Sequence, residues 1–91
     1  MNNCDIRILL GKNIVAWRHR RGMTQSYLSE ACRISDVALS RIENGLAWPK
    51  YSTLSFLANT LNVDIHILFL PLPTENTEPL LSVAEKESEN K

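Results

Sequence analysis

The chain has 91 residues, of which 44% are hydrophobic, and its 10 Lys and Arg residues balance 10 Asp and Glu residues. A chain of this length can bury one modest core without disulfides or metal, and two cysteines are too few for a disulfide framework. No apolar run approaches the roughly 20 residues that a bilayer requires. Asp5 and Arg7 interrupt the apolar N-terminal stretch, which excludes a typical secretory signal. We therefore expect one small cytoplasmic domain with reduced thiols and no membrane contact.

The neutral total hides an uneven distribution of charge. Residues 1–60 hold eight Lys and Arg against four Asp and Glu, whereas residues 61–91 hold two against six. We expect an N-terminal extension at 1–9, a basic domain at 10–70 and an acidic, largely disordered tail at 71–91. A basic domain is compatible with a polyanionic partner.

Two helices are predicted by apolar residues at helical spacing. One runs from about Leu10 to Arg21 and ends at Gly22. The other follows the loop at 46–50. Their inward stripes are Leu10, Ile14, Trp17 and Arg21 in the first, and Leu54, Leu57, Ala58 and Leu61 in the second.

Between them, residues 24–44 carry the most informative pattern. Thr24 and Ser35 each offer a side-chain oxygen to the first turn of a helix, and Asn44-Gly45 provides a stop. Inward positions are taken by Leu28, Cys32, Ile34, Ala38, Leu39 and Ile42. Two short helices joined by a tight turn satisfy this spacing, as in a DNA-binding helix-turn-helix. Asp36, Val37, Ser40, Arg41 and Asn44 then face outward.

Segment 62–70 is ambiguous. Alternation favours a strand whose face holds Val63, Ile65, Ile67 and Phe69, and which pairs with the same strand of a second chain. The alternative is a helix capped by Asp64, with Ile65, Leu68 and Phe69 on one face. The expected fold is therefore an all-α bundle of four to five short helices, with a strand at 62–70 that pairs across a dimer.

One continuous stretch carries a family resemblance, through Gly11, Ile14, Arg18, Gly22 to Gln25, Leu28, Ile34-Ser35, Leu39 to Gly45, Pro49, Leu54 and Ala58 to Val63. From about Leu10 to Phe69 the chain resembles the Cro and lambda-repressor type of helix-turn-helix protein, the XRE family. The resemblance implies a lambda-repressor-like bundle that binds double-stranded DNA.

The resemblance also implies roles for single residues. Base contacts would come from Ser35, Asp36, Val37, Ser40 and Arg41, and phosphate contacts from Gln25, Asn44 and Lys50. Arg18 and Glu43 match a structural ion pair that fixes the second helix of the motif against the first helix of the chain.

Three departures from the family pattern matter. Arg33 replaces the usual glycine at a left-handed turn, which costs about 1 kcal/mol and is offset if Arg33 reaches a phosphate. Asp36 replaces a common glutamine, so it either accepts from cytosine or only caps its helix. The strand expected at 63–70, followed by Pro71-Leu72-Pro73, is similar to the C-terminal strand of HipB-type antitoxins.

For two outward residues the sequence leaves alternatives open. Arg41 either forms a bidentate bond to guanine or contacts only phosphate, and Val37 either touches a thymine methyl group or is incidentally exposed. Trp17 and Trp48 are expected to pack rather than to stack on bases.

Catalysis has little support. His19 and His66 lie in separate elements without neighbouring ligands, and three glycines form no phosphate-binding loop. We expect no enzyme activity, metal or cofactor. The leading hypothesis is a homodimeric, sequence-specific repressor on a palindromic operator, with 35–44 as recognition helix. The alternatives are an antitoxin that binds a toxin protein and autoregulates its operon, and a pure protein-interaction module.

Overall fold

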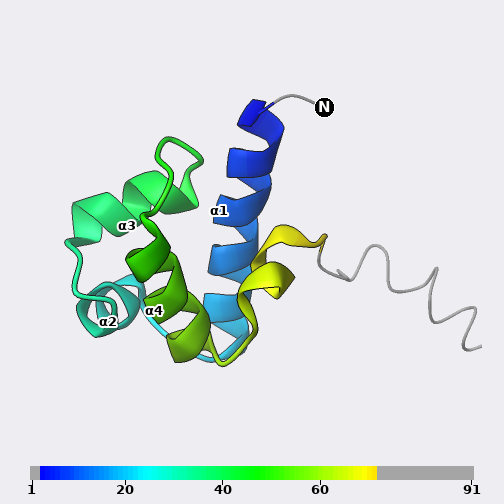
Figure 1. The fold of residues 1–91 in the computed structure, drawn as a ribbon. Coiled ribbons are helices and arrows are strands. Elements are labelled where there is room, and N and C mark those ends of the chain that lie inside the picture. Colours follow the sequence, from blue (N-terminus) through cyan, green and yellow to red (C-terminus); the bar gives the residue numbers. More distant parts are fainter. Residues whose placement is uncertain (1–2, 72–91) are drawn as a thin grey trace, which may run out of the picture.

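Four α-helices and one short 3-10 helix make up the computed structural model, which describes residues 3–71 (Figure 1). The helices are α1 (Asn3–Arg20), α2 (Gln25–Ala31), α3 (Asp36–Glu43), α4 (Tyr51–Leu61) and the 3-10 helix η1 (Ile65–Phe69). The predicted all-α class is confirmed, and residues 3–71 contain no strand. The expected acidic tail lies outside the described residues, apart from Pro71.

Helix α1 begins at Asn3, so the start predicted near Leu10 was wrong. The two β-branched residues Ile6 and Ile8 have modest helix propensity. However, a Cβ placed on Gly45 would lie 3.0 Å from Cγ1 of Ile8. The first turns of α1 thus pack against the turn that follows α3, and this tertiary contact outweighs local propensity.

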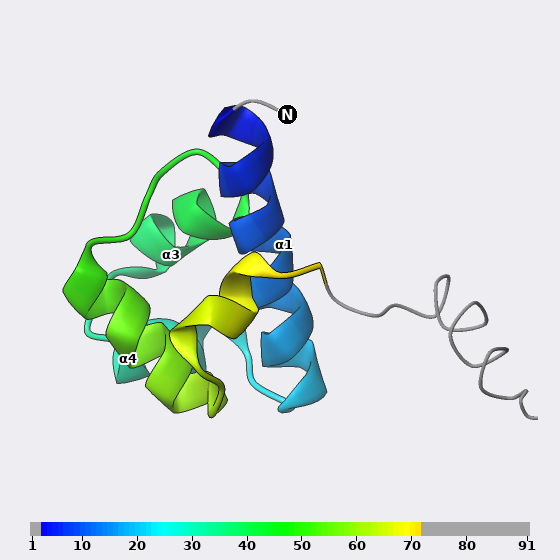
Figure 2. The same ribbon diagram turned by 45° about the vertical axis from the view of Figure 1, so that its right-hand side comes forward.

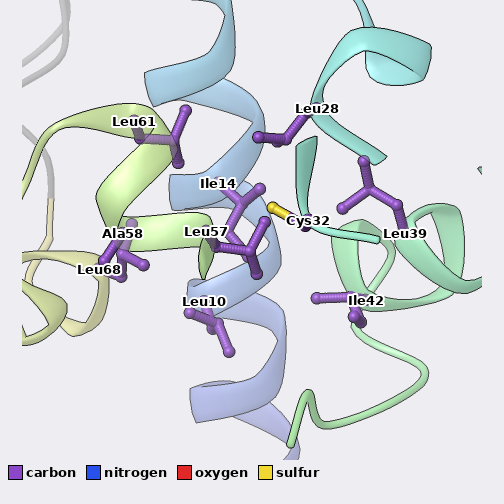
Figure 3. Close-up of a cluster of buried hydrophobic side chains, with 10 residues drawn as sticks. All are labelled: Leu10, Ile14, Leu28, Cys32, Leu39, Ile42, Leu57, Ala58, Leu61 and Leu68. Atoms are coloured by element: carbon purple, nitrogen blue, oxygen red, sulfur yellow. The ribbon is translucent and has the colours of Figure 1, made fainter. Parts of the chain in front are cut away.

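The core lies where all five elements meet (Figure 3). Its buried residues are Leu10, Ile14, Leu28, Cys32, Leu39, Ile42, Leu57, Ala58, Leu61 and Leu68. Every member predicted for the helix-turn-helix is buried except Ile34 and Ala38, which are half-buried. Burial raises the pKa of the Cys32 thiol, which therefore remains protonated and serves as a small apolar side chain.

The start signals of the motif are confirmed. The Thr24 hydroxyl accepts from the Tyr27 amide and the Ser35 hydroxyl from the Ala38 amide, each at 3.0 Å. Each bond satisfies an amide that the first helical turn leaves without a backbone partner. These two caps define where α2 and α3 begin.

The strand predicted at 62–70 was wrong, because residues 65–69 form η1, which lies between α1 and α4 (Figure 2). Leu68 is fully buried, and the half-buried Ile65 and Phe69 pack against the core, as in the helical alternative. The Asp64 side chain makes no capping bond.

Asn13 of α1, which the sequence did not single out, holds this segment. Its Nδ2 donates to the carbonyl oxygens of Leu68 and Leu70, at 2.8 and 2.7 Å. Asn13 is only 3% exposed, so these carbonyls are satisfied inside the protein.

Replacing Asn13 by Ala should lower the free energy of unfolding by about 1–3 kcal/mol, because two carbonyls at the end of η1 lose their donor. Urea denaturation followed by circular dichroism measures this. Asn59→Ala is the matched control, since Asn59 is exposed on α4 and its loss should change stability by no more than about 0.5 kcal/mol. Equal effects of the two variants would contradict the role given to Asn13.

Candidate nucleic-acid interface

The interface begins with a close approach of α1 and α3. A Cβ on Gly11 would overlap the carbonyl oxygen of Glu43 and lie 2.7 Å from that of Ile42. Only glycine permits this separation, so Gly11 lets the last turn of α3 rest directly on α1.

A buried ion pair fixes the same contact. Nε and Nη2 of Arg18 donate to the two carboxylate oxygens of Glu43 at 2.9 and 3.2 Å, and the side chains are 12% and 5% exposed. Nε2 of Gln25 also donates to Glu43, at 3.0 Å. The predicted pair of Arg18 and Glu43 is therefore present. Gln25, which we had expected only at a phosphate, also binds this carboxylate.

Asp36 links α3 to α2. One carboxylate oxygen accepts from the Ser26 hydroxyl at 3.2 Å, and the other accepts from the Ser29 hydroxyl. Ser26 and Ser29 were not predicted, although their i, i+3 spacing places them on one face of α2. The carboxylate thus has hydroxyl partners within the motif, while Ser35 provides the helix cap.

The remaining outward residues of α3 form an exposed surface. Val37 is 69% exposed and Arg41 is also exposed. Ser40 is half-buried, and its carbonyl and hydroxyl accept from Nδ2 of Asn44 at 2.9 and 3.3 Å. Of the five residues predicted to contact bases, only Ser40 is therefore half-buried, and Ser35, Asp36, Val37 and Arg41 are exposed.

Arg33 adopts the left-handed backbone conformation that we predicted, with φ of 62°. It ends α2: its own amide donates to the Glu30 carbonyl, and the Ile34 amide donates to the Ser29 carbonyl. Its side chain is exposed. Arg33 therefore ends α2 in the backbone conformation that glycine usually adopts. This costs backbone strain, but it places a cation at the turn.

Three cations converge on one cleft of about 450 Å³ between the motif and α4: Arg33 from the turn, Arg41 from α3 and Lys50 from the start of α4. The other lining residues are Cys32, Ile34, Ala38, Ile42, Ala47, Trp48, Pro49, Ser52, Thr53 and Phe56, so no carboxylate lines the cleft within the described chain. Trp48 was expected to pack but is 49% exposed here.

Within residues 3–71, no three His, Cys, Asp or Glu side chains cluster as metal ligands would. Nor does that part of the chain contain a helix both long and apolar enough to cross a membrane.

The family model named helix-turn-helix matches residues 14–68, more than half of the chain. The chain belongs to this helix-turn-helix family. It is accordingly a DNA-binding transcriptional regulator, and its fold is of the lambda-repressor type. No curated protein matches the chain significantly.

Two solved structures share the fold. The hypothetical transcription factor NHTF from Neisseria is 23% identical, with a TM-score of 0.70 over 89% of this chain and 90% of that one. A chain of the SinR protein/SinI protein complex is 26% identical, with a TM-score of 0.63 over 90% of this chain and 84% of that one.

Replacing Arg18 by Met should destabilise the fold by about 3–5 kcal/mol, because the buried Glu43 carboxylate loses its cation. The double variant Arg18→Met with Glu43→Leu should lose less, since no uncompensated charge is left behind. Chemical denaturation of both proteins tests this. A double variant less stable than the single one would show that the pair stabilises the fold by some other means.

Proposed function

We propose that this regulator reads a specific, palindromic DNA site as a homodimer and represses transcription by covering a promoter. The observation that carries the proposal is the exposed Arg41 on α3, beside the exposed Val37. An arginine there can form two hydrogen bonds to guanine, and a valine can contact a thymine methyl group. These two residues supply most of the base discrimination in the proposal.

Asp36 and Ser40 have a smaller part in base reading. The Asp36 carboxylate is engaged by two serine hydroxyls, and Ser40 accepts from Asn44. Each carboxylate oxygen of Asp36 retains a further acceptor site, so Asp36 would have to contact cytosine from the position in which the serines of α2 hold it. Ser35 retains a hydroxyl hydrogen for DNA while its oxygen caps α3.

Phosphate contacts are assigned to Arg33 and Lys50, whose exposed cations flank the recognition helix. Gln25 contributes the second N–H of its amide, because the first donates to Glu43. Nδ2 of Asn44 already donates to two atoms of Ser40, so a phosphate contact by Asn44 would replace or share one of these bonds. Such contacts give affinity and orientation without reading sequence.

We infer dimerisation from the small size of the recognition helix. One short helix contacts only a few base pairs, so two copies about 34 Å apart are needed for a useful operator. We assign the contact to the surface of Val63, Ile65, Ile67 and Phe69. Ile67 is the best candidate, since it lines a surface cleft with Trp17 and Val63 and, unlike the other three, does not pack on the core.

The protein would act in the cytoplasm by binding alone, without catalysis. A second candidate function is an antitoxin or another regulator controlled by a protein partner. It is favoured by the likeness to a chain of a two-protein complex. Co-purification of the full chain with the product of a neighbouring reading frame would support this candidate.

Arg41→Ala should change which bases are preferred, whereas Lys50→Ala should weaken binding at all sites about equally and reduce the salt slope by about 1. Selection from random DNA followed by titration at several salt concentrations measures both effects. Uniform weakening by both variants would remove Arg41 from base reading. Failure of the native chain to enrich any sequence would argue for the interaction module instead.

Ile67→Asp should give a monomer with weak operator binding, because the interface would have to bury a carboxylate. His66→Asp is the matched control, since it places the same charge at an exposed position of η1. Sedimentation equilibrium distinguishes the two proteins. An unchanged dimer for Ile67→Asp, or dissociation of both variants, would contradict the assigned interface.

A further inference from the structure

The cleft between α3 and α4 has more apolar surface than phosphate binding explains. Trp48 and Phe56, which both line it, are 49% and 43% exposed. Ile34 and Ala47 line it as well and pack against the core below. Phosphate contacts use cations and polar groups, so the aromatic part of this cleft has no role in the proposed DNA contact.

The positive charge of the cleft indicates the kind of ligand that could bind there. Arg33, Arg41 and Lys50 line the same cleft as the aromatic residues, with no carboxylate among the lining residues of the described chain. A complementary occupant combines apolar side chains with several negative charges. This combination is unlike DNA, which presents phosphates outside and has few accessible apolar groups.

We propose that residues 72–91 of this same chain occupy the cleft. This segment contains five Glu and two Lys, and its apolar residues Leu80, Leu81 and Val83 lie between Glu78 and Glu85. The leucines fill the surface between Trp48 and Phe56, and the flanking glutamates pair with the cations. The segment thus matches the cleft in charge and in apolar character.

The connection to the domain is longer, when extended, than any helix of the described chain. The ten residues from Leu72 to Leu81 can span about 33 Å when extended. The 18 residues of α1, the longest helix of the described chain, measure about 27 Å. Covalent attachment also gives an effective concentration near the millimolar range, so a weak contact suffices.

Docking would compete with DNA, a consequence that depends on the proposed function. Arg33, Arg41 and Lys50 cannot pair with glutamates and with DNA at the same time. The acidic segment therefore lowers DNA affinity and removes Arg41 from base reading until the segment is displaced. A basic partner protein that binds residues 72–91 would release this inhibition.

The first experiment uses the full chain without DNA. Leu80→Ser with Leu81→Ser should shift the indole N–H resonance of Trp48, which a Trp48→Phe spectrum assigns, and leave that of Trp17 unchanged. Asn76→Ser with Thr77→Ser is the matched control and should shift neither. No response of Trp48 to the leucine changes would overturn the docking, whatever happens with DNA. A Trp48 shift that depends on protein concentration would also overturn it, because the occupant would then be another copy.

The second experiment measures DNA affinity of the same full-length proteins. The leucine variant keeps every charge, and it should bind DNA roughly threefold or more tightly than the native chain, since it removes the docked competitor. Tighter binding only after Glu75→Gln and Glu78→Gln, with no effect of the leucine changes, would indicate general repulsion and overturn the competition. A Trp48 shift in a protein that binds no DNA would instead count against the proposed function and leave docking intact.

Discussion

The arrangement of the DNA-facing surface depends on one buried carboxylate. Glu43 is 5% exposed at its side chain, and it accepts from Arg18 of α1 and Gln25 of α2. A carboxylate removed from water needs such donors, so three helices must hold their positions together. Gly11 allows α3 to come close enough to α1 for this pairing. The orientation of the outward face of α3 follows from these contacts.

Hydrogen bonds inside the motif also limit how many polar side chains remain available for DNA. The Asp36 carboxylate joins α2 to α3, Ser35 caps α3, and Asn44 bonds back to Ser40. Polar side chains at the ends of a short helix are needed to satisfy its own backbone and neighbours. A position that faces outward in the sequence pattern is therefore not always free to contact DNA. Side chains that neither cap a helix nor link two elements, above all Arg41, gain importance.

The sequence predicted the parts of the fold that local rules determine. Caps at Thr24 and Ser35 and helical spacing located the helix-turn-helix and most of its core, whereas the Arg18–Glu43 pair was expected only from the family resemblance. Two predictions failed where a distant contact decides the structure. The first turns of α1 depend on the neighbouring Gly45, and η1 depends on Asn13, 55 residues away from Leu68. Alternating apolar residues at 63–69 could not distinguish a strand from a 3-10 helix. The donor that holds this segment, Asn13, is brought to it only by the tertiary fold.

Arg33 connects the energetics of the fold to its function. Glycine at this left-handed turn would avoid a strain of about 1 kcal/mol, and the αL residues that follow α1 and α3, Gly22 and Gly45, are glycines. Asn62, which ends α4, is a residue type that tolerates the same conformation. Arginine has no such tolerance, yet its charge lies at the edge of the cleft that also contains Arg41 and Lys50. Backbone strain retained where it places a cation beside the recognition helix is typical of a functional site, since stability alone would favour glycine.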